Sequence, residues 1–231
     1  MLWHRRVCST GRNDDAFASP AIGDGRALFS IDVIADRPTD AGREIALNAA
    51  TGAPVWSFSP LRYRGTGGGI SGTPAIDARR GRRVAAVGDT LKSSRYVMLD
   101  ELSGALIWQR QLEPATRWMQ SIGTPASTGG VVVVPLYHTP TTGALIALRG
   151  NDGVVIWRVR TGGIYGTPVI WHGIIIAALA NECVVAFDLR NGRPLGRLPV
   201  SSELYGRGLA IDGDTLFVAG RGAFWAYRVE R

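Results

Sequence analysis

One eleven-residue pattern returns along the chain and limits what the chain can fold into. Each copy places a glycine six residues after an alanine or methionine, and most place a tryptophan four residues after that glycine. A glycine at a fixed distance from an apolar segment marks a hairpin, because a tight turn requires the positive φ that glycine adopts without strain. Each copy therefore predicts a strand, a turn and a second strand. The copies are ALNAATGAPVW (46–56), MLDELSGALIW (98–108), ALRGNDGVVIW (147–157) and AFDLRNGRPLG (186–196).

The fourth copy differs from the others because Gly196, preceded by Leu195, stands where tryptophan is expected. A tryptophan that recurs once per repeat suits a wedge between adjacent sheets, since an indole buries a large apolar area and its N–H can donate to a backbone carbonyl. The fourth copy thus predicts one poorly filled junction between sheets. The tryptophans with this predicted structural docking role are Trp3, Trp56, Trp108 and Trp157.

A second phrase lies between the copies and adds two strands to each repeat. It consists of a short apolar strand, a turn containing Gly or Asp, and a β-branched strand. The turn glycines at 52, 104, 153 and 192 are 52, 49 and 39 residues apart. Such a period with four antiparallel strands per repeat predicts an all-β fold, a β-propeller. The second phrase occurs at 19–31, 73–88, 124–137, 167–180 and, in a weaker form, 208–220.

We expect a single propeller domain, 1–231, of about five four-stranded blades. Residues 2–6 resemble the end of a repeat and residues 222–229 resemble its third strand, so their pairing would close the ring and protect the sheet edges. A piece cut in phase from a longer propeller would have the same complementary ends, and that alternative stays open. The expected blades are 17–60, with an insertion at 35–42, then 70–112, 121–160, 164–200, and 205–229 plus 2–6.

Charge does not indicate a nucleic-acid partner, although the net charge is +7 and the pI about 10.1. Lys92 is the only lysine among the 26 basic residues, and the arginines are scattered along the chain. A nucleic-acid surface gathers its basic residues on one face. We therefore interpret the arginines as solvated and expect no nucleic-acid partner.

Cysteine and histidine do not form a recognisable chemical motif in this sequence. Cys8 and Cys183 are too few for a disulfide framework and lack metal-ligand spacing, so a buried, inert thiol is expected at each. No apolar run approaches the roughly 18 residues of a membrane-spanning helix, and no signal peptide is visible in MLWHRRVCST. The histidines, none of which has a ligand-spaced partner, are His4, His138 and His172.

The repeat resembles the tryptophan-docking repeat of the pyrroloquinoline-quinone (PQQ) propellers, the quinoprotein-like family. The resemblance is carried by ALNAATGAPVW, SGTPAID and SGALIW and covers nearly the whole chain. It implies a β-propeller with either of two functions. The family includes quinoprotein alcohol dehydrogenases, and it also includes non-enzymatic members such as the lipoprotein scaffold of the outer-membrane protein assembly machine. The segment Gly65–Asp77 is similar to a glycine-rich stretch of the dehydrogenase branch.

Most of the chemistry that the dehydrogenase branch requires cannot be placed in this sequence. That branch uses an adjacent cysteine pair beside the quinone, whereas Cys8 and Cys183 are isolated. It also needs a calcium site of carboxylate and amide oxygens with an aspartate base, and no corresponding acidic cluster stands out. We therefore expect no cofactor and no catalytic or metal-binding residue; PQQ with calcium belongs only to the dehydrogenase alternative.

A recognition surface is expected at the mouth of the central channel, at the loops that enter the innermost strands. Aromatic and arginine side chains are enriched at binding hot spots, and several precede the Ser/Thr-Pro positions that begin those strands. Ordinary loop packing would also account for these side chains. The candidate partner-binding residues are Arg64, Trp118, Gln120, Tyr165, Tyr205 and Arg207.

The sequence thus favours a non-catalytic binding or scaffold propeller that recognises a protein or small ligand. The alternative is a diverged or truncated PQQ-dependent, alcohol-type dehydrogenase domain. We expect a monomer without a transmembrane segment. The family resemblance implies the periplasm or cell envelope, an expectation that the lack of a visible signal peptide does not support.

Overall fold

The computed structural model consists of β-strands joined by turns, as the sequence predicts. Every strand pair is antiparallel, and no helix occurs in the part of the chain that the structure describes. The strands form five sheets, which belong to two compact units: Met1–Ile122 with Asn151–Gly153, and Gly123–Gly150 with Val154–Arg231. The described residues are 1–7, 14–15, 18–33, 42–59, 70, 72–79, 82–89, 95–113, 123–181, 183–201, 204 and 208–230.

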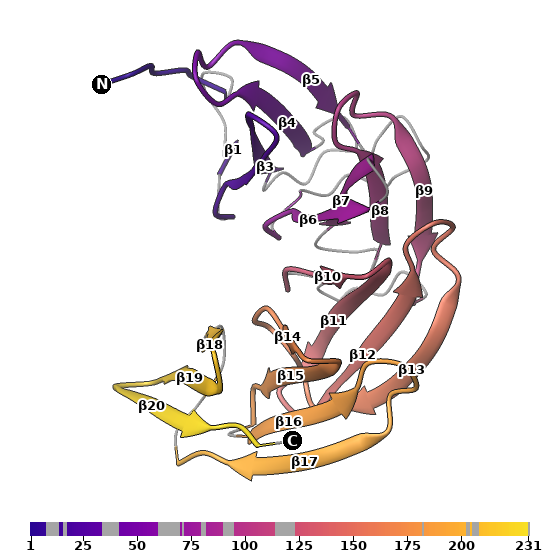
Figure 1. Ribbon diagram of the computed structural model, residues 1–231, viewed down its shortest axis with the longest axis vertical. Helices are drawn as coiled ribbons and strands as arrows, with labels where there is room; N and C mark the ends of the chain where they lie inside the picture. Colours follow the sequence, from indigo (N-terminus) through magenta and orange to yellow (C-terminus); the bar gives the residue numbers. More distant parts are fainter. Residues whose placement is uncertain are drawn as a thin grey trace. The chain divides into compact units, whose positions relative to one another are not determined.

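Unit 1 contains two sheets (Figure 1). In the first sheet the short strand β1 (Asp14–Asp15) pairs with the end of β3, beside the hairpin that β2 forms with the start of β3. The remaining strands of this sheet are β2 (Ala21–Gly23), β3 (Arg26–Val33), β4 (Arg43–Asn48) and β5 (Pro54–Phe58). The second sheet comprises β6 (Ala75–Arg79), β7 (Arg82–Asp89), β8 (Arg95–Asp100) and β9 (Leu106–Gln111).

Unit 2 contains three sheets, which Figure 1 draws from salmon to yellow. The third sheet of the chain comprises β10 (Ala126–Thr128), β11 (Val131–Thr139), β12 (Thr142–Arg149) and β13 (Val155–Thr161). The fourth comprises β14 (Val169–Trp171), β15 (Ile174–Leu179), β16 (Cys183–Asp188) and β17 (Pro194–Pro199). The fifth comprises β18 (Leu209–Asp212), β19 (Thr215–Gly220) and β20 (Ala223–Arg228).

Residues 1–7 form no strand, and the predicted pairing of residues 2–6 with 222–229 stays a prediction. A two-residue turn at His172 joins β14 to β15. His172 and Gly173 both have positive φ, 45° and 80°, between the paired residues Trp171 and Ile174. Two consecutive positive φ values match the twist of the flanking strands, which is why such turns are common in hairpins.

The last two strands of four sheets share one register, which contains a one-residue bulge. In the first sheet Ala46 pairs with Trp56 and Leu47 pairs with Pro54, so Val55 is the extra residue. A bulge raises the local twist and redirects the side chains beside it. In the other three sheets the same one-residue bulge lies next to the pairs Met98–Trp108, Ala147–Trp157 and Ala186–Gly196. In three of the four sheets the residue that follows the bulge is a tryptophan: Trp56, Trp108 or Trp157.

Apolar side chains from neighbouring sheets form the cores. In unit 1, Leu28 and Ala46 of the first sheet share a buried cluster with Val97 and Leu99 of the second. Val97 and Leu99 lie two residues apart on β8 and so face the same side of the sheet. Tyr96 and Met98, on the other side of β8, are buried as well, so this strand is covered on both faces. In the described part of unit 2, one buried cluster contains Val133, Leu145, Ile175 and Phe187, and another contains Ile176, Val184, Leu216 and Val218.

Candidate functional site: docking turns and a binding surface

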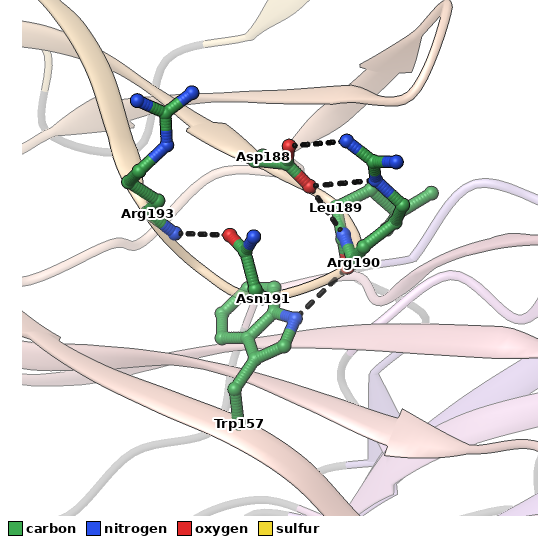
Figure 2. Close-up of polar contacts among 6 residues, drawn as sticks. All are labelled: Trp157, Asp188, Leu189, Arg190, Asn191 and Arg193. Carbon is green, nitrogen blue, oxygen red and sulfur yellow. Dashed lines mark hydrogen bonds and ion pairs between the residues drawn. The ribbon is translucent and has the colours of Figure 1, made fainter.

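The turn between β16 and β17 contacts Trp157, the tryptophan of the preceding repeat (Figure 2). The Asp188 N–H donates to the Arg193 carbonyl at 2.9 Å, and the Gly192 N–H donates to the Asp188 carbonyl at 2.8 Å. The Asp188 carboxylate also accepts the Arg190 backbone N–H at 2.8 Å, the local bond that makes Asp and Asn favourable in turns. Gly192 has φ of 72°, as the repeat predicts.

Trp157 of β13 lies against this turn. Its indole N–H donates to the Leu189 carbonyl at 2.8 Å (Figure 2). A Cβ on Gly192 would lie 2.8 Å from the Trp157 ring, closer than any real Cβ contact. Trp157 is 9% exposed. Position 192 therefore requires glycine for two reasons: the backbone has a positive φ, and the Trp157 indole occupies the space that a side chain would fill.

Unit 1 repeats this arrangement three times. The N–H of Trp3 donates to the Ala49 carbonyl at 2.9 Å, and that of Trp56 donates to the Glu101 carbonyl at 2.8 Å. The rings of Trp3, Trp56 and Trp108 lie against Gly52, Gly104 and Gly153, each with φ of 68°. In each case the tryptophan contacts a later turn of the chain. That these contacts stabilise the fold stays a prediction.

The β16–β17 turn also exposes basic side chains. Arg190 is 86% exposed on its side chain and forms an ion pair with Asp188 at 3.1 Å. The hydrogen bonds from the Arg190 side chain and backbone hold the pKa of Asp188 below its ordinary value. Arg193 of the same turn is exposed as well, and its backbone N–H donates to Asn191. This turn is anchored through its backbone and presents cationic groups to solvent.

Of the candidate partner-binding residues, only Tyr165 lies in the described part of the chain. Tyr165 follows β13 and is partly buried. Its ring packs edge-to-face on Tyr137 of β11, with ring centroids 5.4 Å apart and an interplanar angle of 84°. The edge-to-face geometry is one of the favoured arrangements of an aromatic pair. The binding role of Tyr165 stays a prediction. The other candidates, Arg64, Trp118, Gln120, Tyr205 and Arg207, lie outside the described residues.

A buried acidic residue, Glu44 of β4, was not singled out by its sequence context. Its side chain is fully buried, and its Oε2 lies 2.8 Å from Ser30 Oγ, which also lies 2.8 Å from the Gly72 carbonyl. A hydroxyl has one proton to donate and cannot serve both oxygens. Burial raises the pKa of Glu44 to about 8. A neutral Glu44 is compatible with both contacts, because Glu44 Oε2 then donates to Ser30 and Ser30 donates to Gly72, while Glu44 Oε1 has no hydrogen-bond partner among the described residues.

The PQQ-and-calcium site of the dehydrogenase alternative does not fit the described residues. No three His, Cys, Asp or Glu side chains among them lie close enough to hold a metal ion. Cys183 is buried in β16, where its thiol accepts the Arg197 side-chain N–H at 2.9 Å, while Cys8 lies outside the described residues. The described part of the chain has no helix long and apolar enough to span a membrane.

Comparison with known proteins identifies the family. The sequence model of the family described as outer membrane protein assembly factor BamB matches residues 2–231. The chain belongs to this family. BamB of Moranella endobia (strain PCIT) is 30% identical over 107 residues, which are 41% of this chain. The match spans only 26–28% of the length of the curated BamB relatives.

Solved structures support the β-propeller fold predicted from the sequence. BamB from Moraxella catarrhalis has a TM-score of 0.63 and 22% identity, covering 93% of this chain and 59% of that one. The quinohemoprotein alcohol dehydrogenase from Comamonas testosteroni has a TM-score of 0.68 and 15% identity, covering 94% and 42%. At these identities the likeness shows the fold alone. The predicted quinoprotein-like repeat is confirmed by both the family and the fold.

Proposed function

We propose that this chain is a non-catalytic β-propeller scaffold that acts in outer-membrane protein assembly. The observation that supports the proposal is the BamB family match, which extends from residue 2 to residue 231. The setting would be the periplasm or cell envelope. The chain would act by holding a partner protein on its loops, without a cofactor.

The construction of the repeats supports a binding role. Backbone hydrogen bonds fix the turns, and an indole closes the side of each turn at Gly52, Gly104, Gly153 and Gly192. Turns fixed in this way would lose little conformational entropy when a partner binds to them. The proposed recognition surface lies at the channel mouth, with Arg64, Trp118, Tyr165 and Arg207 as its anchors.

The experiment is a deletion of the gene followed by quantitative mass spectrometry of the outer-membrane fraction. We expect deletion to lower the amounts of several outer-membrane proteins, the wild-type gene to restore them, and a gene with alanine at all four anchors to fail. Arg193→Ala is the matched control, since it removes an exposed arginine from the β16–β17 turn. Unchanged outer-membrane protein levels after deletion would contradict the proposal.

A further inference from the structure

The fourth sheet has a vacancy at the position of the docking tryptophan. Gly196 of β17 pairs with Ala186 beside the bulge. Trp157 has the same position in the third sheet, where it pairs with Ala147. A Cβ on Gly196 would meet no atom within 4 Å, in contrast to the crowded turn glycines. Space for an indole is therefore open where the repeat normally supplies one.

A cavity of about 240 Å³, open to solvent, lies at this position within unit 2. Besides Gly196, its apolar walls include Leu198 and Leu216, together with Tyr227 of β20 and Val229 just after it. Its charged lining residues are Arg197, Arg228 and Glu230. An apolar cavity of about 150 Å³ is large enough to bind benzene. The present cavity thus has room for the two fused rings of an indole.

The cavity also includes a backbone segment that corresponds to the indole acceptor of the other junctions. The Ala49 and Leu189 N–H groups donate to the Gly25 and Gly173 carbonyls at 2.7 and 2.9 Å, and the carbonyls of Ala49 and Leu189 accept the N–H groups of Trp3 and Trp157. The Val229 N–H donates in the same way to the Asp214 carbonyl, at 2.8 Å. Val229 therefore holds the corresponding place after β20.

We propose that this cavity binds the indole ring of a tryptophan side chain that a partner polypeptide supplies. The partner indole replaces the one missing at Gly196, packs against Leu198 and Tyr227, and donates its N–H to the Val229 carbonyl. The other junctions of the same chain show which group this geometry accepts. The inference rests on the proposed binding function and names one chemical feature of the partner.

The experiment follows the methyl resonances of Leu198, Leu216 and Val229 in ¹³C-labelled full chain. Three probes are titrated: indole, N-acetyl-tryptophanamide and 1-methylindole. We expect saturable shifts of these resonances with the first two, and at least about tenfold weaker binding of 1-methylindole, because it has no N–H to donate. Gly196→Trp should abolish binding of all three by filling the cavity, whereas Gly208→Trp, outside the cavity lining, should not.

The titration has outcomes that would overturn the proposed binding of a partner tryptophan. Lack of binding by the wild-type chain, or equal binding by the Gly196→Trp chain, would overturn the proposal. Binding of free indole without N-acetyl-tryptophanamide would show a small-molecule site and overturn the polypeptide source. If Gly196→Trp does not fold, Gly196→Leu fills part of the cavity and should still weaken binding. These results are independent of the outer-membrane assay, so failure here leaves the proposed function standing.

Discussion

Replacing the turn glycine Gly104 by alanine isolates the contact between indole and glycine. Gly104 has φ of 68°, and its added Cβ would lie 2.5 Å from Trp56 Cδ2. Gly25 is the matched control, because it has φ of 73° but nothing within 4 Å of its added Cβ. Both variants lose the freedom of glycine, and only Gly104→Ala also displaces an indole.

The expected magnitudes follow from these two contributions. The left-handed conformation costs alanine about 1–2 kcal/mol, so Gly25→Ala should destabilise the fold by that amount. Overpacking a filled site adds about 1–3 kcal/mol, which gives about 2–5 kcal/mol for Gly104→Ala. In a Trp56→Ala background the overpacking contribution should vanish, leaving about 1–2 kcal/mol for Gly104→Ala.

Urea unfolding at 25 °C, followed by far-UV circular dichroism, measures these differences without relying on tryptophan fluorescence. The four chains needed for the cycle are wild type, each single variant and the double variant, with Gly25→Ala beside them. A Gly104→Ala chain no less stable than Gly25→Ala would refute the reasoning. So would a full Gly104→Ala effect that persists without the Trp56 indole.

The remaining predictions concern stability and cofactor use. Trp108→Ala should destabilise the chain by about 3–5 kcal/mol, measured by thermal or urea unfolding, and a variant that melts like wild type would remove the wedge role. Because the pKa of Glu44 is raised from 4.5 to about 8 in the folded chain, the folded state keeps a proton that the unfolded state releases. Stability should therefore fall from about pH 4.5 to 8, by at most about 1.4 kcal/mol per pH unit, and Glu44→Gln should remove that slope in urea unfolding; equal slopes would contradict the assignment. Incubation with PQQ and calcium should yield neither bound-cofactor absorbance nor dye reduction with alcohols, and a positive result would favour the dehydrogenase alternative.

The sequence predicts the hairpins well because glycine and tryptophan each carry a local physical requirement. A positive φ at Gly52 or Gly192 follows from the turn alone and needs no knowledge of the rest of the fold. The missing indole at Gly196 is likewise readable from the repeat. The bulge beside each tryptophan is not readable from the repeat, since only the pairing of the two strands shows which residue is the extra one.

Features that depend on tertiary packing could not be predicted. Glu44 occurs in a strand that follows a polar insertion, where a carboxylate suggests an exposed position. In the fold, Glu44 is buried beside Ser30, whose hydroxyl also contacts the carbonyl of Gly72, a residue distant in sequence. The same holds for the cavity, because the Val229 wall comes from a different sheet than Gly196. The repeat pattern shows that a tryptophan is missing at Gly196, and only the fold shows which residues surround that position.

Hydrogen exchange of the indole N–H groups, resolved in a ¹H–¹⁵N spectrum, tests the central claim most directly. In the proposed architecture, the indole N–H groups of Trp3, Trp56 and Trp157 each bond to the backbone of a later turn, whereas the fourth repeat has Gly196 in place of the tryptophan. The account predicts strong protection for the indole N–H groups of Trp3, Trp56 and Trp157, each bonded to a carbonyl at 2.8–2.9 Å. Exchange of these three at the rate of free tryptophan would contradict it.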